Sequence, residues 1–133
     1  MQIEQLASMK PLARKDAINA LQASMTEGSV HDVLPIESFF ADGIYARQMM
    51  MPEGMVVVGK AKKREYMTVL SAGAVYEASE EGVKLHVAPA TFVSPPFCKR
   101  VLWAQRDTVL TTYHATEATT VEEAEADIVA TEY

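Results

Sequence analysis

The sequence predicts one mainly β domain, a jelly-roll barrel or sandwich, with an N-terminal helix and a short acidic C-terminal helix. Three observations predict this class: short β-rich runs separated by turn residues, a helical pattern before them, and an acidic helical pattern after them. The length of 133 residues suits a single hydrophobic core. We expect an N-terminal helical arm over residues 1–34, the jelly roll over 35–115, and the acidic helix or tail over 116–133.

The N-terminal arm has the apolar spacing of an amphipathic helix. Proline suits the first turn of a helix, as at Pro11, and glycine suits its end, as at Gly28. The apolar stripe between them is narrow, so we expect this helix to pack on the outside of the domain or against a partner. The stripe consists of Leu12, Ile18, Leu21 and Met25.

Eight β-rich runs follow from Ile44 onward, and turn residues separate them at short intervals. Eight short strands with tight turns are typical of an antiparallel jelly roll. The runs are IYARQMMM, MVVVGK, YMTVLS, AVYEA, VKLHVA, ATFVS, KRVLWA and DTVLTTYH. We place Phe39 and Phe40 in a turn before the first run. Phe97 lies in the loop that begins with Pro95 and Pro96 and leads to the seventh run.

The C-terminal segment predicts a short acidic helix. Thr119 followed by Glu122 resembles a capping box, and Val121, Ile128 and Val129 form a weak apolar stripe. The net charge of −6 is divided as −3 over residues 1–53, +3 over 54–114 and −6 over 115–133. Because opposite charges attract, we expect the acidic tail to lie against the basic middle of its own subunit or of a neighbour.

Composition excludes several classes of function. An acidic chain is a poor general binder of nucleic acid, and no apolar run approaches the roughly 20 residues that span a bilayer. The start lacks the basic-then-apolar order of a secretory signal.

Cys98 is the only cysteine, which excludes an internal disulfide. Lys99 and Arg100 beside it would lower the pKa of its thiol. Because no base is near in the sequence, we expect Cys98 to be a structural residue.

The stretch from Gly54 to Gly73 has the spacing of a metal-binding motif without its ligands. Between these glycines come five residues, Lys60, one residue, Lys62, three residues, Tyr66 and six residues. This spacing resembles the first motif of the cupin family, in which two histidines and a glutamate hold a metal. A weaker second motif retains Pro95 and has Arg100 at the position of the third histidine.

The cupin resemblance implies a jelly-roll fold and an inherited ligand pocket, but not metal binding. Protonated lysine and arginine do not coordinate divalent cations, since such sites need imidazole, thiolate or carboxylate. We therefore expect no metal and no cofactor. His31, His86 and His114 are scattered, and for His114 we expect a structural hydrogen bond at the end of a strand.

Several strings also resemble a small cupin-like family encoded by tailed bacteriophages. They include GIYARQMMMPEG, APATFVSPP and DTVLTTYHATEAT, and the resemblance covers roughly residues 35–130. That family has histidines at the positions of Lys62 and Tyr66, and a glycine at the position of Phe97. The resemblance implies a bacteriophage protein. The lost metal ligands, apolar loops, Met-rich strand and terminal helices that need a partner indicate a non-enzymatic virion structural protein, in head decoration or in a tail or connector. It would be located in the virion, and in the host cytoplasm during assembly, with other virion proteins as partners.

The motif register brings four residues to one place in the barrel: Lys60, Lys62, Tyr66 and Arg100. They would form an anion-binding pocket if their charges face the lumen without carboxylate partners. Otherwise solvent or an acidic neighbour, namely Glu65, Glu77 or Asp107, neutralises them. The first outcome favours the alternative function, a metal-independent cupin that binds a small anion or sugar, or an isomerase.

Apolar residues outside the core predict a homo-oligomer. Strand alternation places Met49 and Met51 on one face and Met50 on the other, so both faces of that strand need a cover. Phe97 adds an apolar side chain in a loop. We therefore expect these four residues at an interface between subunits.

Overall fold

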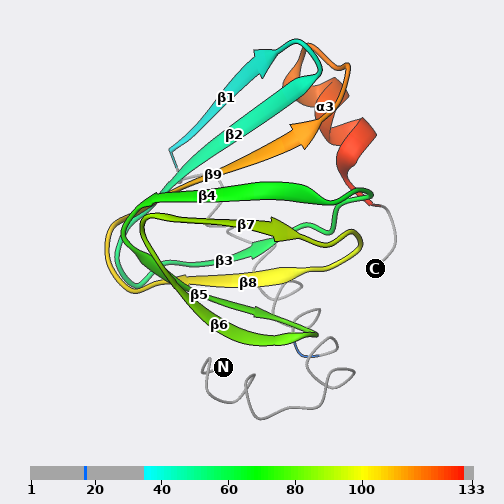
Figure 1. Ribbon diagram of the computed structural model, residues 1–133. Coiled ribbons are helices and arrows are strands. Elements are labelled where there is room, and N and C mark those ends of the chain that lie inside the picture. The colour runs from blue at the N-terminus through cyan, green and yellow to red at the C-terminus, as the bar shows by residue number, and fades with distance from the viewer. Residues whose placement is uncertain (1–16, 18–34, 131–133) are drawn as a thin grey trace.

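A computed structural model describes residue 17 and residues 35–130 as two antiparallel β-sheets that face each other (Figure 1). The five-stranded sheet has the order β1-β2-β9-β4-β7, and the four-stranded sheet has the order β3-β8-β5-β6. The elements are β1 (Ile36–Ala41), β2 (Ile44–Met51), β3 (Val56–Gly59), β4 (Tyr66–Ala72), β5 (Ala74–Ser79), β6 (Gly82–Val87), β7 (Ala90–Ser94), β8 (Arg100–Ala104), β9 (Thr108–Ala115) and α3 (Val121–Ile128). The predicted N-terminal helix lies outside the described residues, apart from Ala17.

All eight predicted runs form strands, and β1 is an additional strand that the sequence analysis missed. Phe39 and Phe40 belong to β1 and not to a turn. The turn that they precede is Asp42-Gly43, where Gly43 has a positive φ of 77°. β1 is an edge strand whose residues are mostly exposed, so its pattern lacks the apolar alternation of a half-buried strand.

The core lies between the two sheets and is built from alternate residues of the strands. Its largest cluster includes Met49 and Met51 of β2, which are 3% and 1% exposed. Met50, between them, is 44% exposed and points to the outside. Of the four residues expected at an interface, only Met50 and Phe97 are therefore accessible to a partner.

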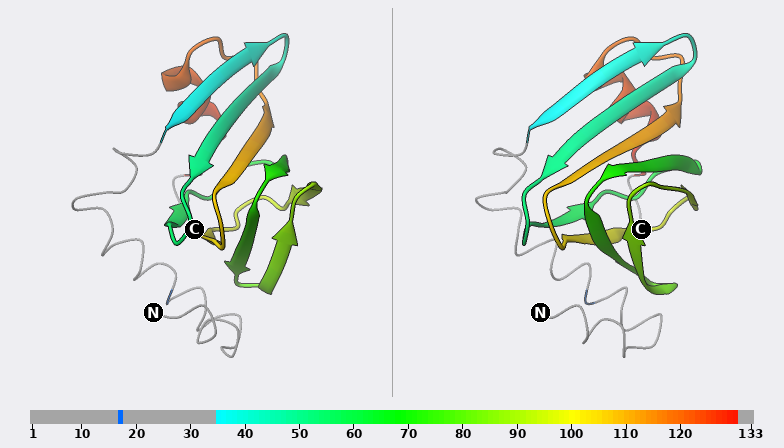
Figure 2. Two further views of the ribbon diagram at one scale, coloured as in Figure 1. Left: turned by 90° about the vertical axis from the view of Figure 1, so that its left-hand side faces the viewer. Right: turned by 60° about the vertical axis from the view of Figure 1, so that its left-hand side comes forward.

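An aromatic row crosses the inner face of the five-stranded sheet and supports α3. Phe40 stacks on Tyr45 with ring centroids 5.0 Å apart, and His114 lies between Tyr45 and Tyr66 at 5.8 and 4.7 Å. Tyr45 forms one buried cluster with two residues of α3, Ala124 and Ile128. The helix lies behind β1 in both views of Figure 2.

The C-terminal helix was predicted one residue too early at its start. Thr120, not Thr119, is the N-cap, and its side chain accepts a hydrogen bond from the backbone N–H of Glu123. Val121 is exposed, whereas Ala124 and Ile128 are buried on the helix face that packs against Tyr45. No helix among the described residues is long and apolar enough to cross a membrane.

The outer face of the four-stranded sheet carries a small apolar cluster. Val58, Ala78 and Val101 are buried there, and the described residue Ala17 packs against them.

Both motif glycines have backbone conformations that other residues rarely adopt. Gly54 has a φ of 85° and Gly73 a φ of 88°. A Cβ added at Gly73 would meet the backbone of Asp107 and Thr108, whereas a Cβ at Gly54 would meet nothing within 4 Å. Phe97 also has a positive φ, of 59°, a backbone conformation that glycine adopts more readily than phenylalanine.

We predict that Gly73→Ala lowers the free energy of unfolding much more than Gly54→Ala. Both substitutions place alanine at a positive φ, which costs about 1–2 kcal/mol. Only Gly73→Ala adds a clash with backbone, so we expect it to lower the free energy of unfolding by more than about 3 kcal/mol. Denaturant titrations of the two variants measure this. Equal losses of stability would contradict the close contact of Gly73, between β4 and β5, with the start of β9.

Candidate ligand-binding site

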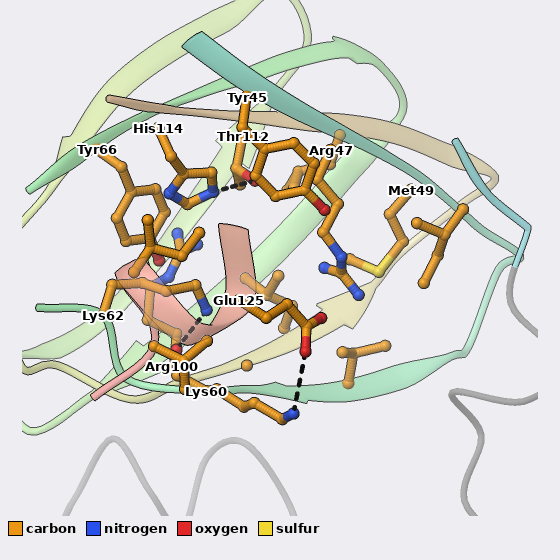
Figure 3. A pocket seen from close by; sticks show the side chains of 17 residues that line it. Tyr45, Arg47, Met49, Lys60, Lys62, Tyr66, Arg100, Thr112, His114 and Glu125 are labelled. Atoms are coloured by element: carbon orange, nitrogen blue, oxygen red, sulfur yellow. Dashed lines mark hydrogen bonds and ion pairs between the residues drawn. The ribbon is translucent and has the colours of Figure 1, made fainter. Parts of the chain in front are cut away.

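A cavity of about 360 Å³ lies between the two sheets, and α3 covers one side of it (Figure 3). Paired residues of β2 and β9 line the cavity, and they change from polar at one end to apolar at the other. The successive pairs are Tyr45–His114, Arg47–Thr112 and Met49–Leu110. The four-stranded sheet and its flanking loop complete the wall with Val57, Gly59, Lys60, Lys62, Arg100 and Leu102. The cavity therefore has a basic, hydroxyl-rich end and an apolar end.

Arg100 enters the cavity from the start of β8 and is held by an ion pair. Its Nη1 lies 2.7 Å from Oε2 of Glu77, and the side chains are 8% and 14% exposed. Its guanidinium also lies over the Tyr66 ring, 5.1 Å from the centroid. Burial alone would lower the pKa of Arg100, but Tyr66 and Glu77 together raise it. Arg100 is thus a permanently charged wall of the cavity.

Lys62 lies in the loop between β3 and β4 and points into the same cavity (Figure 3). Its Nζ donates a hydrogen bond to the backbone carbonyl of Lys60 at 2.6 Å. Burial, and then the positive charges of Arg47, Arg100 and Lys60, lower the pKa of Lys62 to about 7. Its ammonium is therefore easily deprotonated as long as no anion is close to it.

Two further charged residues set the electrostatics of the cavity. Lys60 is at the rim, where its Nζ lies 3.9 Å from Oε2 of Glu125 on α3, and both side chains are about half exposed. Arg47 reaches inward from β2, on the opposite side of the cavity from Lys62 (Figure 3). Among the described residues, no carboxylate is in ion-pair contact with Arg47 or with Lys62.

His114 is a neutral hydrogen-bonding group in this site. Its Nε2 lies 2.8 Å from the Thr112 hydroxyl, and the residue is 4% exposed. Burial, followed by the charges of Lys62, Arg47 and Arg100, lowers the pKa of His114 to about 3. The expected structural hydrogen bond at the strand end is confirmed.

Several contacts fasten α3 and the following residues over the cavity. The backbone of residues 61–63 bonds with that of 128–130, through Lys63 to Ile128 and Ala130 to Ala61. Arg64 forms an ion pair of 2.8 Å with Asp127, which also accepts a hydrogen bond from the Thr116 hydroxyl. The acidic tail therefore lies against the basic middle of its own chain, as one of the two expected arrangements.

The residues at the cupin ligand positions do not fit a divalent metal. Lys60, Lys62 and Arg100 offer cationic nitrogen, and Tyr66 offers a phenol beside a guanidinium. Within residues 35–130, no three His, Cys, Asp or Glu side chains are grouped so that they could hold a metal ion. These side chains offer hydrogen-bond donors and positive charge to the cavity.

The four predicted site residues all line the cavity, but they divide into different roles. Lys62 faces the lumen without a carboxylate partner, whereas Lys60 is neutralised by Glu125 and Arg100 by Glu77. Of the three acidic neighbours considered from the sequence, only Glu77 forms such a pair among the described residues. The expectation that an acidic neighbour neutralises these charges was thus correct for Arg100, through Glu77, but not for Lys62.

Sequence reasoning missed Arg47, Tyr45, Thr112 and Glu125 as lining residues. A signal for Arg47 was present, because a charged residue stands on the same strand face as Tyr45 and Met49. Burial, followed by the nearby Glu81 and Glu80, raises the pKa of Cys98, the reverse of the lowering that its basic neighbours would cause. Cys98 is buried, which supports a structural role.

No family model and no curated protein sequence matches this chain. Solved structures do match it. The cupin domain of Cnp3 from Schizosaccharomyces pombe superposes with a TM-score of 0.55 and 18% identity over 70% of each chain. KdgF from a Halomonas species gives 0.55 and 14% identity over 64% of this chain and 80% of that chain. A cupin-2 domain containing protein from Shewanella frigidimarina gives 0.52 and 8% identity, over 62% and 80%.

These similarities show the fold, which is that of a cupin. The fold predicted from the motif spacing is confirmed in its two antiparallel sheets and its C-terminal helix. At such low identities the solved structures carry no information about the ligand of this chain. The site must be interpreted from its own residues.

We predict that Glu77→Gln destabilises the protein by about 3 kcal/mol, because it leaves the buried Arg100 charge without its partner. Glu125→Gln is the matched control, since it removes the same charge from an exposed pair and should cost less than about 1 kcal/mol. Chemical denaturation of both variants measures the difference. Losses of equal size would show that the Arg100–Glu77 pair is not a buried anchor.

Proposed function

We propose that this protein binds a small organic carboxylate inside the barrel, without a metal ion. The observation that carries this proposal is the pair of basic side chains, Arg47 and Lys62, that reach into one cavity from opposite sides. Neither has a carboxylate partner within the described part of the chain. An anion between them would gain charge-assisted hydrogen bonds from both.

The balance of charges in the cavity supports a single negative group. Glu77 neutralises Arg100 and Glu125 neutralises Lys60, so Arg47 and Lys62 supply the remaining positive charge. Burial, and after it the charge of Arg47, disfavours the ammonium form of Lys62 and lowers its pKa, so two partly buried cations without an anion destabilise each other. A bound carboxylate would remove this repulsion.

The apolar end of the cavity supports a ligand with an apolar body. Met49, Val57, Leu102 and Leu110 belong to both the cavity lining and the main core cluster. A cavity of about 360 Å³ is at the small end of the range for ligand sites. We therefore infer a compact monocarboxylate with a short hydrocarbon tail, whose head lies near Arg47 and Lys62.

Hexanoate is the probe that tests this binding, and hexanamide is its uncharged match. We expect calorimetry to detect hexanoate and to show binding at least about tenfold weaker for hexanamide, which cannot pair with a cation. Arg47→Gln should weaken hexanoate by a similar factor, while Arg106→Gln, at an exposed site, should not. Equal binding of the acid and the amide would contradict the anion site.

The affinity for hexanoate should also depend on pH. The carboxylate favours protonated Lys62, whose pKa is about 7 without ligand, so affinity should be highest below pH 7 and fall as pH rises above it. The slope is at most about tenfold per pH unit for one proton. His114, with a pKa of about 3, stays neutral throughout. Titrations from about pH 6 to pH 9 measure this, and Lys62→Met should abolish the slope.

A second candidate function is the one that the phage resemblance implies, a non-enzymatic virion component that assembles as a homo-oligomer. It is favoured by the outer face of the five-stranded sheet. Register places one apolar row across all five strands of this face: Phe39, Ala46, Tyr113, Met67 and Val93. Four of these side chains are 40–57% exposed.

The occupant that fits this outer face is a second copy of the chain. The outward positions in the paired strands carry a single charge, Glu37 on the edge strand. An uncharged face matches another uncharged face, and a two-fold axis brings two copies of it together. Such pairing is a building step for a decoration, tail or connector protein.

We predict that the protein is oligomeric and that Met67→Asp separates it into monomers. Leu85→Asp on the other sheet is the matched control, because Leu85 is 50% and Met67 48% exposed. Light scattering coupled to size exclusion measures the mass, and a phage that encodes this chain should contain it in purified particles. A wild-type monomer at all concentrations, or absence from particles, would overturn this second candidate.

A further inference from the structure

Lys62 has an amine that could react as a nucleophile, which anion binding alone does not use. A role for this amine rests on the proposed carboxylate site. The side chain lies inside the cavity, with its Nζ hydrogen-bonded to the Lys60 carbonyl at 2.6 Å and 5.9 Å from the Tyr66 ring centroid. It stands within the field of Arg47 and Arg100. A lysine amine that is shielded from water and lies beside other cations is the kind that becomes a nucleophile.

The protonation state of Lys62 agrees with this environment. Its pKa of about 7, lowered first by burial and then by Arg47, Arg100 and Lys60, leaves about half of the amine neutral at pH 7. The amine of an exposed lysine is almost entirely protonated at that pH. Glu125 opposes the shift, but its effect on Lys62 is smaller than that of the three cations.

We propose that Lys62 forms a reversible imine with the carbonyl carbon of a 2-oxo acid whose carboxylate is held by Arg47. In a 2-oxo acid, the anionic group and the carbonyl occupy adjacent carbons. Arg47 and Lys62 reach into one cavity from opposite sides, so a single small molecule can meet both (Figure 3). The hydrocarbon part of the acid would extend toward Met49 and Leu110.

The reaction needs no oxidant or reductant. The Nζ lone pair forms a bond to the carbonyl carbon, and the carbonyl π pair moves to oxygen, which takes up a proton. The attached nitrogen then loses one proton, and the lone pair that this frees forms the second carbon–nitrogen bond while the hydroxyl takes up a proton and leaves as water. Loss of the remaining N–H proton gives the neutral imine. Tyr66, whose ring centroid lies 5.9 Å from the Lys62 Nζ, supplies a phenol that can relay a proton between nitrogen and oxygen.

The other lysines of this region lack the same setting. Lys60 is exposed at the rim and paired with Glu125. Lys63 is exposed, and its Nζ donates to the backbone carbonyl of Ala126. Because Lys63 is adjacent in sequence but outside the cavity, it is the matched control for Lys62.

The test is reductive trapping with 2-oxohexanoate and cyanoborohydride, followed by peptide mapping. An imine reduced in place leaves a secondary amine, so the peptide containing Lys62 should gain the mass of the acid less one oxygen atom. Lys62→Arg should lose the adduct, and Lys63→Arg should keep it. Mapping on the wild-type chain decides the site even if Lys62→Arg does not fold.

Two comparisons separate this inference from the binding proposal. 2-Hydroxyhexanoate has the same carboxylate without the carbonyl, so it should bind, leave no adduct and slow the trapping of 2-oxohexanoate. The trapping rate should rise between about pH 6 and pH 8 as Lys62 loses its proton, while hexanoate affinity falls.

The imine is overturned if 2-oxohexanoate binds as tightly as hexanoate but leaves no adduct on Lys62, or labels Lys63 to the same extent. In that case the carboxylate site stands. If hexanoate, 2-hydroxyhexanoate and 2-oxohexanoate all fail to bind, the proposed function fails and this inference fails with it.

Discussion

The buried ion pair between Arg100 and Glu77 is the constraint on which the charged interior of the barrel depends. A charge this deep must be paired, because its desolvation costs several kcal/mol. Glu77 also lies 3.3 Å from His86, whose ring stacks on Phe92, so the pair connects both sheets. Burial is the largest cause of the lowered pKa values of Lys62 and His114, and Arg100 adds to it together with Arg47. The cavity therefore contains an amine, that of Lys62, with a pKa of about 7, and a histidine, His114, that stays neutral.

The acidic C-terminal segment closes this interior, and the uneven charge of the chain explains how. Glu125 pairs with Lys60 at the rim, and Asp127 pairs with Arg64 and Thr116. These surface contacts are individually weak. The bridge between Lys62 and Val129 and the packing of Ile128 on Tyr45 add backbone and apolar contacts at the same place. The loop that carries Lys62 is thus held by α3 and the residues after it. The same contacts cover the cavity and fix the position of the Lys62 amine.

The fold was predictable from the sequence because turn residues and motif glycines leave a local signal. Gly73 must be glycine for both its φ and its contact with β9, and it marked the motif correctly. The site was predictable only in part. Spacing found Lys60, Lys62, Tyr66 and Arg100, yet it could not show which cation has a partner, since Glu77 and Glu125 come from β5 and α3. Arg47 was missed because the motif does not include β2, and β1 because an exposed edge strand has little apolar alternation.

The central claim is that the barrel lumen holds a carboxylate head near Arg47 and Lys62 and an apolar tail near Met49 and Leu110. A crystal structure with 6-bromohexanoate tests it most directly, because anomalous scattering locates the bromine at the tail. We predict a bromine peak beside Met49, Leu102 and Leu110, with the carboxylate between Arg47 and Lys62. A saturated crystal with the bromine only outside the barrel, or with the tail and head reversed, would contradict this account.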